Sequence, residues 1–141
     1  MTALPIEKFA SICKRISLNL PSNARWAWDE RFNLALVVFE EKDYDLVHMP
    51  IILEFEHRWD YFSLPGAFDL LKDHAVNAFG LIPGQEIFTA TGTTGDGTFL
   101  FATLWPWGDG NRFSLRVGII SPLLDLETTR CHLVDWLKIS N

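Results

Sequence analysis

The last third of the chain, from Thr98 to Leu137, constrains the fold more than any other stretch. Two apolar segments, Thr98–Trp105 and Arg112–Ile120, lie on either side of a turn that contains two glycines. Apolar segments of this length joined by a short glycine-containing turn are typical of a β-hairpin. A Pro-Leu-Leu-Asp sequence follows, and Asp125 is a suitable N-cap for a final amphipathic helix. We therefore expect an antiparallel hairpin that leads into a C-terminal helix.

Helical spacing appears in two earlier segments. Residues 5–20 begin with a proline, carry apolar side chains at intervals of three and four, and end before Pro21, which cannot continue a helix. Residues 67–80 carry a second apolar stripe and end at Gly80, a suitable C-terminal cap. Both segments are therefore expected to be helices.

The segments between these helices are typical of β-strands. They are 26–28, 32–39 and 51–56, with a further short strand at 59–62, and 86–91 after the second helix. Because short turns join the strands, we expect mostly antiparallel pairing, with the helices packed against the sheet. The predicted fold class is α+β, in a single domain over residues 1–141, with the order α-βββ-α-βββ-α.

The acidic composition narrows the classes of partner. The chain has 18 Asp and Glu against 12 Lys and Arg, a net charge of −6. A negative protein repels phosphate backbones and anionic lipid, so we expect it to bind neither nucleic acid nor membrane. Cys13 and Cys131 lie far apart and do not make a disulfide framework, and we see neither a signal peptide nor a membrane span. These features predict a cytoplasmic protein.

Sequence motifs bear on two kinds of site, a phosphate-binding loop and a zinc site. The glycine-rich segment 92–97 lacks the Lys-Ser/Thr of a phosphate loop and precedes a strand rather than a helix, so we interpret it as a hairpin turn. The four histidines have no spacing typical of zinc ligands. We therefore expect neither a cofactor nor a metal.

One group of residues is a candidate for acid–base chemistry. Glu54 and Glu56 would share a face of the strand predicted at 51–56, with His57 and Asp60 close behind. The alternative is the solvated face of a half-exposed strand, with Arg58 as a counter-charge. No motif for an activated serine or cysteine accompanies the group, so we expect a non-enzymatic protein.

Tryptophan is unusually abundant, with six residues in the chain. Trp105 and Trp107 flank a proline in the predicted hairpin turn, where at least one indole ring should be exposed. Tryptophan is enriched at the centres of protein–protein interfaces because it buries a large area at little entropic cost. We interpret these two residues as candidates for partner binding.

The C-terminal segment from Ser114 to Asp125, with the helix after it, resembles the small acidic class I type III secretion chaperones. Members of that family end a strand in a Pro-Leu-Asp-type corner before an amphipathic helix, and their first helix is similar to residues 6–20 here. The resemblance implies a virulence-associated chaperone without nucleotide or metal. It would act as a homodimer that holds the N-terminal segment of a secreted effector unfolded for export.

The resemblance also implies which residues would act. An effector segment would lie over apolar patches on the first helix and the sheet, pairing with a strand edge. The partner-binding residues would be Ile6, Phe9, Ile12, Ile16, Val37 and Phe39. The second helix would supply the dimer interface through Leu71, Ala75 and Ala78.

Other functions fit the same composition. An immunity or inhibitor protein that masks a folded, basic toxin would also be small, acidic and free of catalytic motifs. A co-chaperone or regulator-binding relative of the same fold is a further alternative. An enzyme comes after these, because it rests only on Glu54, Glu56 and His57.

Overall fold

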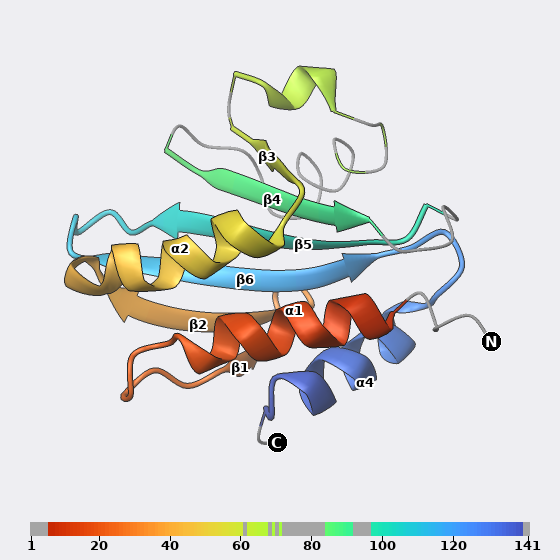
Figure 1. The fold of residues 1–141 in the computed structure, drawn as a ribbon, viewed down its shortest axis with the longest axis horizontal. Helices are drawn as coiled ribbons and strands as arrows, with labels where there is room; N and C mark the ends of the chain where they lie inside the picture. The colour runs from red at the N-terminus through yellow and green to blue at the C-terminus, as the bar shows by residue number, and fades with distance from the viewer. Residues whose placement is uncertain are drawn as a thin grey trace.

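The computed structural model describes residues 6–60, 62–67, 69, 71, 84–91 and 97–139, and its elements form one antiparallel sheet with helices (Figure 1). In chain order the elements are α1 (Glu7–Leu18), β1 (Ala27–Asp29), β2 (Leu34–Glu40), the 3₁₀ turn η1 (Glu41–Asp43), α2 (Tyr44–Glu54), β3 (His57–Trp59), the 3₁₀ turn η2 (Leu64–Gly66), β4 (Glu86–Thr91), β5 (Phe99–Pro106), β6 (Arg112–Ile120) and α4 (Leu126–Trp136). The predicted α+β class with a mostly antiparallel sheet is confirmed.

The hairpin of β5 and β6 lies at the centre of the sheet. The strand order is β1-β2-β6-β5-β4-β3, and all neighbours are antiparallel. The hairpin is in register from Phe99 opposite Ile120 to Pro106 opposite Phe113. Gly110 in its turn has a φ of 74°, a conformation that glycine adopts at no steric cost. The C-terminal hairpin expected from the sequence is confirmed.

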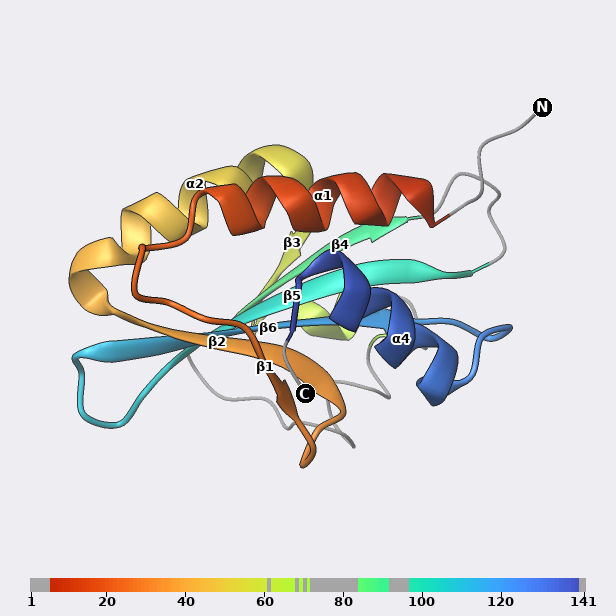
Figure 2. The ribbon, with the colours of Figure 1, turned by 90° about the horizontal axis from the view of Figure 1, so that it is seen from below.

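Helices cover one face of the sheet. Figures 1 and 2 show α1 and α2 together on the same side. The main core lies beneath them, because alternate side chains of β2, β4, β5 and β6 point toward the helices. It includes Leu133 of α4. A second apolar cluster on the opposite face joins Leu64, Ala67 and Leu71 to Ile87 and Phe101.

The first helix buries its apolar stripe. Phe9, Ile12, Cys13 and Ile16 recur at intervals of three and four, so they share one face of α1 and lie in the main core. Ile6, just before the helix, packs against the same core. The expectation that α1 offers an exposed apolar patch is therefore wrong, because the sheet already occupies that face.

Residues 44–54 form a helix, and the strand predicted at 51–56 is wrong. The alternation after Ile51 resembles a strand, and a proline at position 50 is typical of a break before it. The proline instead lies inside α2. Val47 and Ile51, four residues apart, are both buried against the sheet, and this packing outweighs the cost of a proline in a helix.

The order of elements differs from the prediction for the same reason. Two strands precede α2, and β3 at His57–Trp59 follows it, close to the short strand expected at 59–62. The helix predicted at 67–80 lies mostly outside the described residues. The turn η1 connects β2 to α2.

Candidate protein-binding surface

The outward side of α2 is apolar and exposed. Leu46, Met49 and Leu53 recur at intervals of three and four, so they share one side of the helix, and Ile52 borders them. Met49 is 57% exposed and Leu53 is 75% exposed. We call Leu46, Met49, Ile52 and Leu53 the α2 outer face. A surface helix normally presents polar side chains here, so four large apolar residues on one short helix indicate a contact surface.

Polar contacts fix the first half of α2 to the sheet. The Tyr44 hydroxyl donates a hydrogen bond to Glu86 of β4, and the His48 ring nitrogen Nε2 lies 3.3 Å from the Glu86 Oε2 atom. Arg58 of β3 donates from Nε to the same oxygen at 2.6 Å. The Tyr44 and His48 rings stack with centroids 4.8 Å apart. One carboxylate thus joins the helix to two strands.

The Glu86 carboxylate is held in its charged form. Partial burial opposes its ionisation, but hydrogen bonds from Tyr44 and Arg58 and the charges of His48 and Arg58 outweigh burial and lower the pKa of Glu86. Burial and the adjacent carboxylate together raise the pKa of Tyr44 well above its ordinary value. The Tyr44 hydroxyl therefore stays a hydrogen-bond donor at neutral pH. These directions fit a structural anchor.

Ion pairs with α1 fix the other end of α2. The Arg15 Nη1 atom lies 2.8 Å from the Glu54 Oε2 atom. Lys8 pairs with Glu56, which also accepts a hydrogen bond from the Thr91 hydroxyl at 3.1 Å. The Lys8 hydrogen bond is the main cause that lowers the pKa of Glu56. The helix is therefore anchored near both ends.

The predicted acid–base group does not assemble. Glu54 ends a helix rather than sharing a strand face with Glu56, and each carboxylate has its own cation on α1. The His57 ring lies 6.1 Å from the Trp59 ring, centroid to centroid. Asp60 accepts backbone hydrogen bonds from residues 62 and 63. The predicted shared strand face is therefore wrong, and Glu54 and Glu56 are each engaged in an ion pair.

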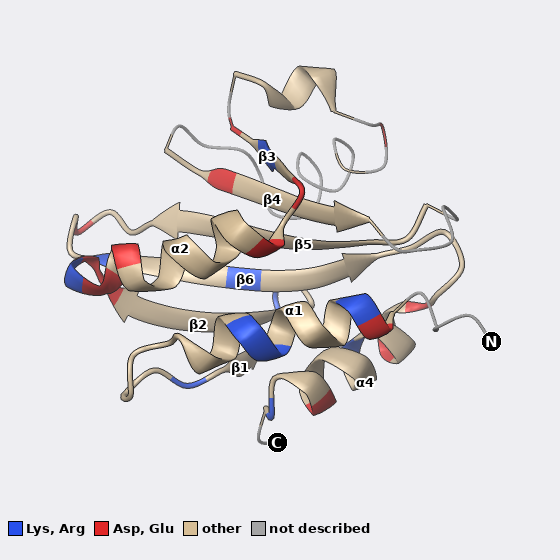
Figure 3. Ribbon diagram, viewed as in Figure 1, with Lys and Arg blue, Asp and Glu red and all other residues tan. Residues whose placement is uncertain are grey.

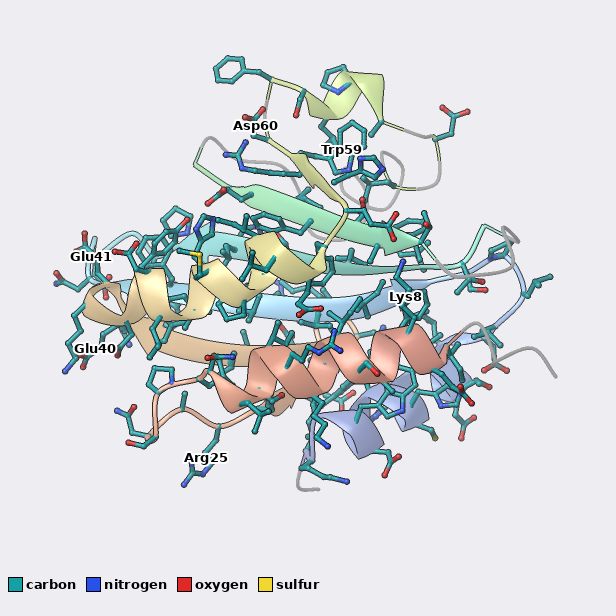
Figure 4. The ribbon with its side chains drawn as sticks, in the orientation of Figure 1. Lys8, Arg25, Glu40, Glu41, Trp59 and Asp60 are labelled. Atoms are coloured by element: carbon teal, nitrogen blue, oxygen red, sulfur yellow. The ribbon has the colours of Figure 1, made fainter. Side chains whose placement is uncertain are left out.

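Carboxylates gather where α2 begins. Figure 3 shows acidic residues at this end of the helix, and Figure 4 shows Glu40 and Glu41 at the same end of the molecule. Glu40 pairs with Lys42 at 3.3 Å. No ion pair forms at Glu41, Asp43 or Asp45 within the described part of the chain. The α2 outer face therefore has an acidic border.

The two candidate tryptophans differ in exposure. Trp105 is half-buried, with the Arg116 guanidinium 4.1 Å from its ring centroid and the Phe32 ring edge-on at 5.6 Å. Trp107 is exposed, with Arg112 stacked 4.1 Å from its ring centroid. The expectation of one exposed indole in this turn is confirmed.

The remaining predicted contact residues lie in the core or outside the described residues. Val37 and Phe39 of β2 are buried beneath the helices, so they offer no surface to a partner. Leu71 is fully buried in the second apolar cluster, which contradicts its expected place in a dimer interface. Ala75 and Ala78 lie outside the described residues.

A second concave surface lies between β1 and α4. This groove has a volume of about 1060 Å³ and is lined by Trp28 and by α4 residues that include Arg130, Cys131 and Asp135. Arg130 pairs with Glu30 at 3.0 Å and lies over the Trp28 ring. Its lining mixes both signs of charge, so it indicates no single class of ligand.

The residues that the structure describes contain neither a metal cluster nor a helix that could span a membrane. Among the described residues, no three His, Cys, Asp or Glu side chains are grouped as metal ligands. No helix in the described part of the chain is long and apolar enough to cross a membrane.

No family model, curated protein or solved structure matches this chain. The resemblance to type III secretion chaperones thus stays a prediction from sequence patterns. The α2 outer face is not among the sites predicted from the sequence. The signal that could have found it is the spacing of Leu46, Met49 and Leu53, which becomes visible once residues 44–54 are treated as one helix.

Proposed function

We propose that this protein is a non-enzymatic binding module that docks a protein partner on the α2 outer face. The observation that carries the proposal is the row of exposed Leu46, Met49 and Leu53 on one side of a helix whose other side is packed on the sheet. Removing such side chains from water is the main favourable term in most protein association. An apolar helix face that meets a partner surface is a recurrent mode of recognition.

The anchoring of α2 favours a folded partner. Contacts to Glu86 fix the first half of the helix, and the Arg15 ion pair fixes its end. A surface held in place before binding loses little conformational entropy when the partner arrives. An inhibitor or immunity protein that masks a folded partner uses a surface of this kind. We therefore favour the inhibitor role over the secretion-chaperone role.

The secretion-chaperone role requires an exposed apolar surface for an effector segment. The resemblance implies that it uses apolar side chains of α1 and β2, and these are buried here. An effector segment would therefore need another surface, and the α2 outer face is the candidate that the geometry offers. In that case the partner would be an unfolded N-terminal segment bound by a homodimer.

The test compares Leu53→Glu with Leu123→Glu. The two leucines are 75% and 70% exposed, and Leu123 lies before α4, outside the α2 outer face. Each variant, with the wild-type chain, is used to capture proteins from lysate of the source organism, and the retained proteins are quantified by mass spectrometry. Circular dichroism checks that both variants are folded.

We expect at least one protein to be retained by wild type and by Leu123→Glu but lost with Leu53→Glu. Equal retention by both variants would refute docking on α2. Native mass and limited proteolysis of the complex then separate the two roles. A one-to-one complex with an intact domain supports the inhibitor role, and two copies protecting an extended segment support the chaperone role.

A further inference from the structure

We infer that the partner docked on α2 is a basic protein whose apolar contact surface is bordered by lysine and arginine. This inference rests on the proposed function and names the class of partner. Three observations support it. The α2 outer face is bordered mainly by carboxylates, several of these carboxylates form no ion pair within the described part of the chain, and a second copy of this chain would bring like charge to the same surface.

Charge around the α2 outer face is mostly negative. Six carboxylates lie at the two ends of the helix, with three cations among them. The carboxylates are Glu40, Glu41, Asp43, Asp45, Glu54 and Glu56, and the cations are Lys8, Arg15 and Lys42. The net charge of this border is −3, so a partner with complementary charge must be positive.

Ion pairs leave the excess negative charge near the N-terminus of α2. Lys8 and Arg15 are engaged with the two carboxylates near the end of α2, and Lys42 pairs with Glu40. Glu41, Asp43 and Asp45 form no ion pair within the described part of the chain. The helix N-terminus offsets roughly half a unit charge. The three carboxylates that lack an ion pair among the described residues therefore leave a net negative charge of more than two units beside the α2 outer face.

A second copy of this chain fits the face poorly. In a symmetric dimer about α2, both copies would bring a border of −3 to the same interface, and each whole chain carries −6. Like charges placed across an interface oppose association. Opposite charges would steer encounter and raise the association rate. The border therefore selects a basic partner over self-association.

The experiment reverses one border charge and compares it with a distant reversal. Asp45→Lys changes an exposed carboxylate beside Leu46, whereas Glu127→Lys makes the same change of charge on α4. The probe is the protein that wild type retains from lysate and Leu53→Glu does not. Its association with purified wild type and both variants is measured by biolayer interferometry at 50 mM and 500 mM salt.

We expect Asp45→Lys to slow association by about tenfold at 50 mM salt, and the difference to shrink at 500 mM because salt screens exposed charges. Glu127→Lys should stay within about twofold of wild type, since its charge lies outside the contact. Circular dichroism confirms that both variants are folded.

Three results would overturn the inference and leave docking on α2 intact. They are an acidic or neutral probe protein, equal effects of the two charge reversals, and a homodimer of the purified chain that Leu53→Glu dissociates. The first two exclude selection by charge, and the third assigns the face to a second copy. If Leu53→Glu retains every protein that wild type retains, the proposed function itself is refuted.

Discussion

Replacing Glu86 with glutamine tests how α2 is held in place for docking. The side chain is 14% exposed and accepts hydrogen bonds from Arg58 and Tyr44, with His48 Nε2 at 3.3 Å. Glutamine has nearly the same volume, so the change removes the charge without creating a cavity. The tyrosine hydroxyl can still donate to the amide oxygen, but the interaction with Arg58 loses its charge.

The expected cost is about 2 kcal/mol. A hydrogen bond to a charged group contributes roughly 1.5–3 kcal/mol. The Arg58 side chain is 51% exposed, so solvent screening reduces what its bond to Glu86 contributes. The less exposed contacts of the Glu86 carboxylate contribute the rest of the cost. For a chain of this length, 2 kcal/mol corresponds to a drop in Tm of roughly 6 °C.

The assay is urea unfolding of wild type, Glu86→Gln and the control Glu41→Gln at several pH values. Because the folded-state pKa of Glu86 is lowered from 4.5, its charge stabilises the fold above that pH. This contribution is lost as pH falls through the folded-state pKa. We therefore expect the full difference from wild type at pH 7 and a smaller one at pH 3. A loss no larger than that of Glu41→Gln, or one independent of pH, would refute the anchoring role.

Three further predictions concern packing, capping and thiol chemistry. A Cβ at Gly118 would lie 2.6 Å from a ring carbon of Phe101, so Gly118→Ala should lower the free energy of unfolding by about 1–3 kcal/mol; an unchanged urea midpoint would contradict this packing. Asp125 accepts a backbone hydrogen bond at the start of α4, so Asp125→Ala should lower the Tm while Asp125→Asn retains most of it, and equal losses would exclude capping. Burial raises the pKa of the Cys13 thiol to about 12 while Cys131 is exposed, so a thiol reagent at pH 8 should label one cysteine in the folded chain and two in urea; rapid labelling of both would contradict this burial.

The parts of the fold that were predicted correctly depend on local signals. The hairpin of β5 and β6 follows from two long apolar segments around a glycine turn, and α1 follows from its spacing. The sequence around α2 gave conflicting signals, because Pro50 interrupts a helix in most contexts and residues 51–56 alternate like a strand. Only packing of Val47 and Ile51 on the sheet decides between them.

The candidate site was harder to predict because exposure depends on the whole fold. Both α1 and α2 carry rows of apolar side chains, and their spacing does not say which row faces the sheet. The partners of Glu54 and Glu56 are also distant in sequence, at Arg15 and Lys8. Without those pairs, the two carboxylates resemble an acid–base pair. In the folded chain each one anchors a helix.

The most direct test of docking on α2 is hydrogen exchange measured by mass spectrometry. The chain is compared alone and in complex with the protein that wild type retains and Leu53→Glu loses. Docking on the α2 outer face predicts slower exchange in peptides covering residues 44–54, with exchange unchanged in peptides covering 126–136. Protection confined to α4 or to the groove beside β1, with α2 unchanged, would contradict the account and move the binding surface to the other side of the helical layer.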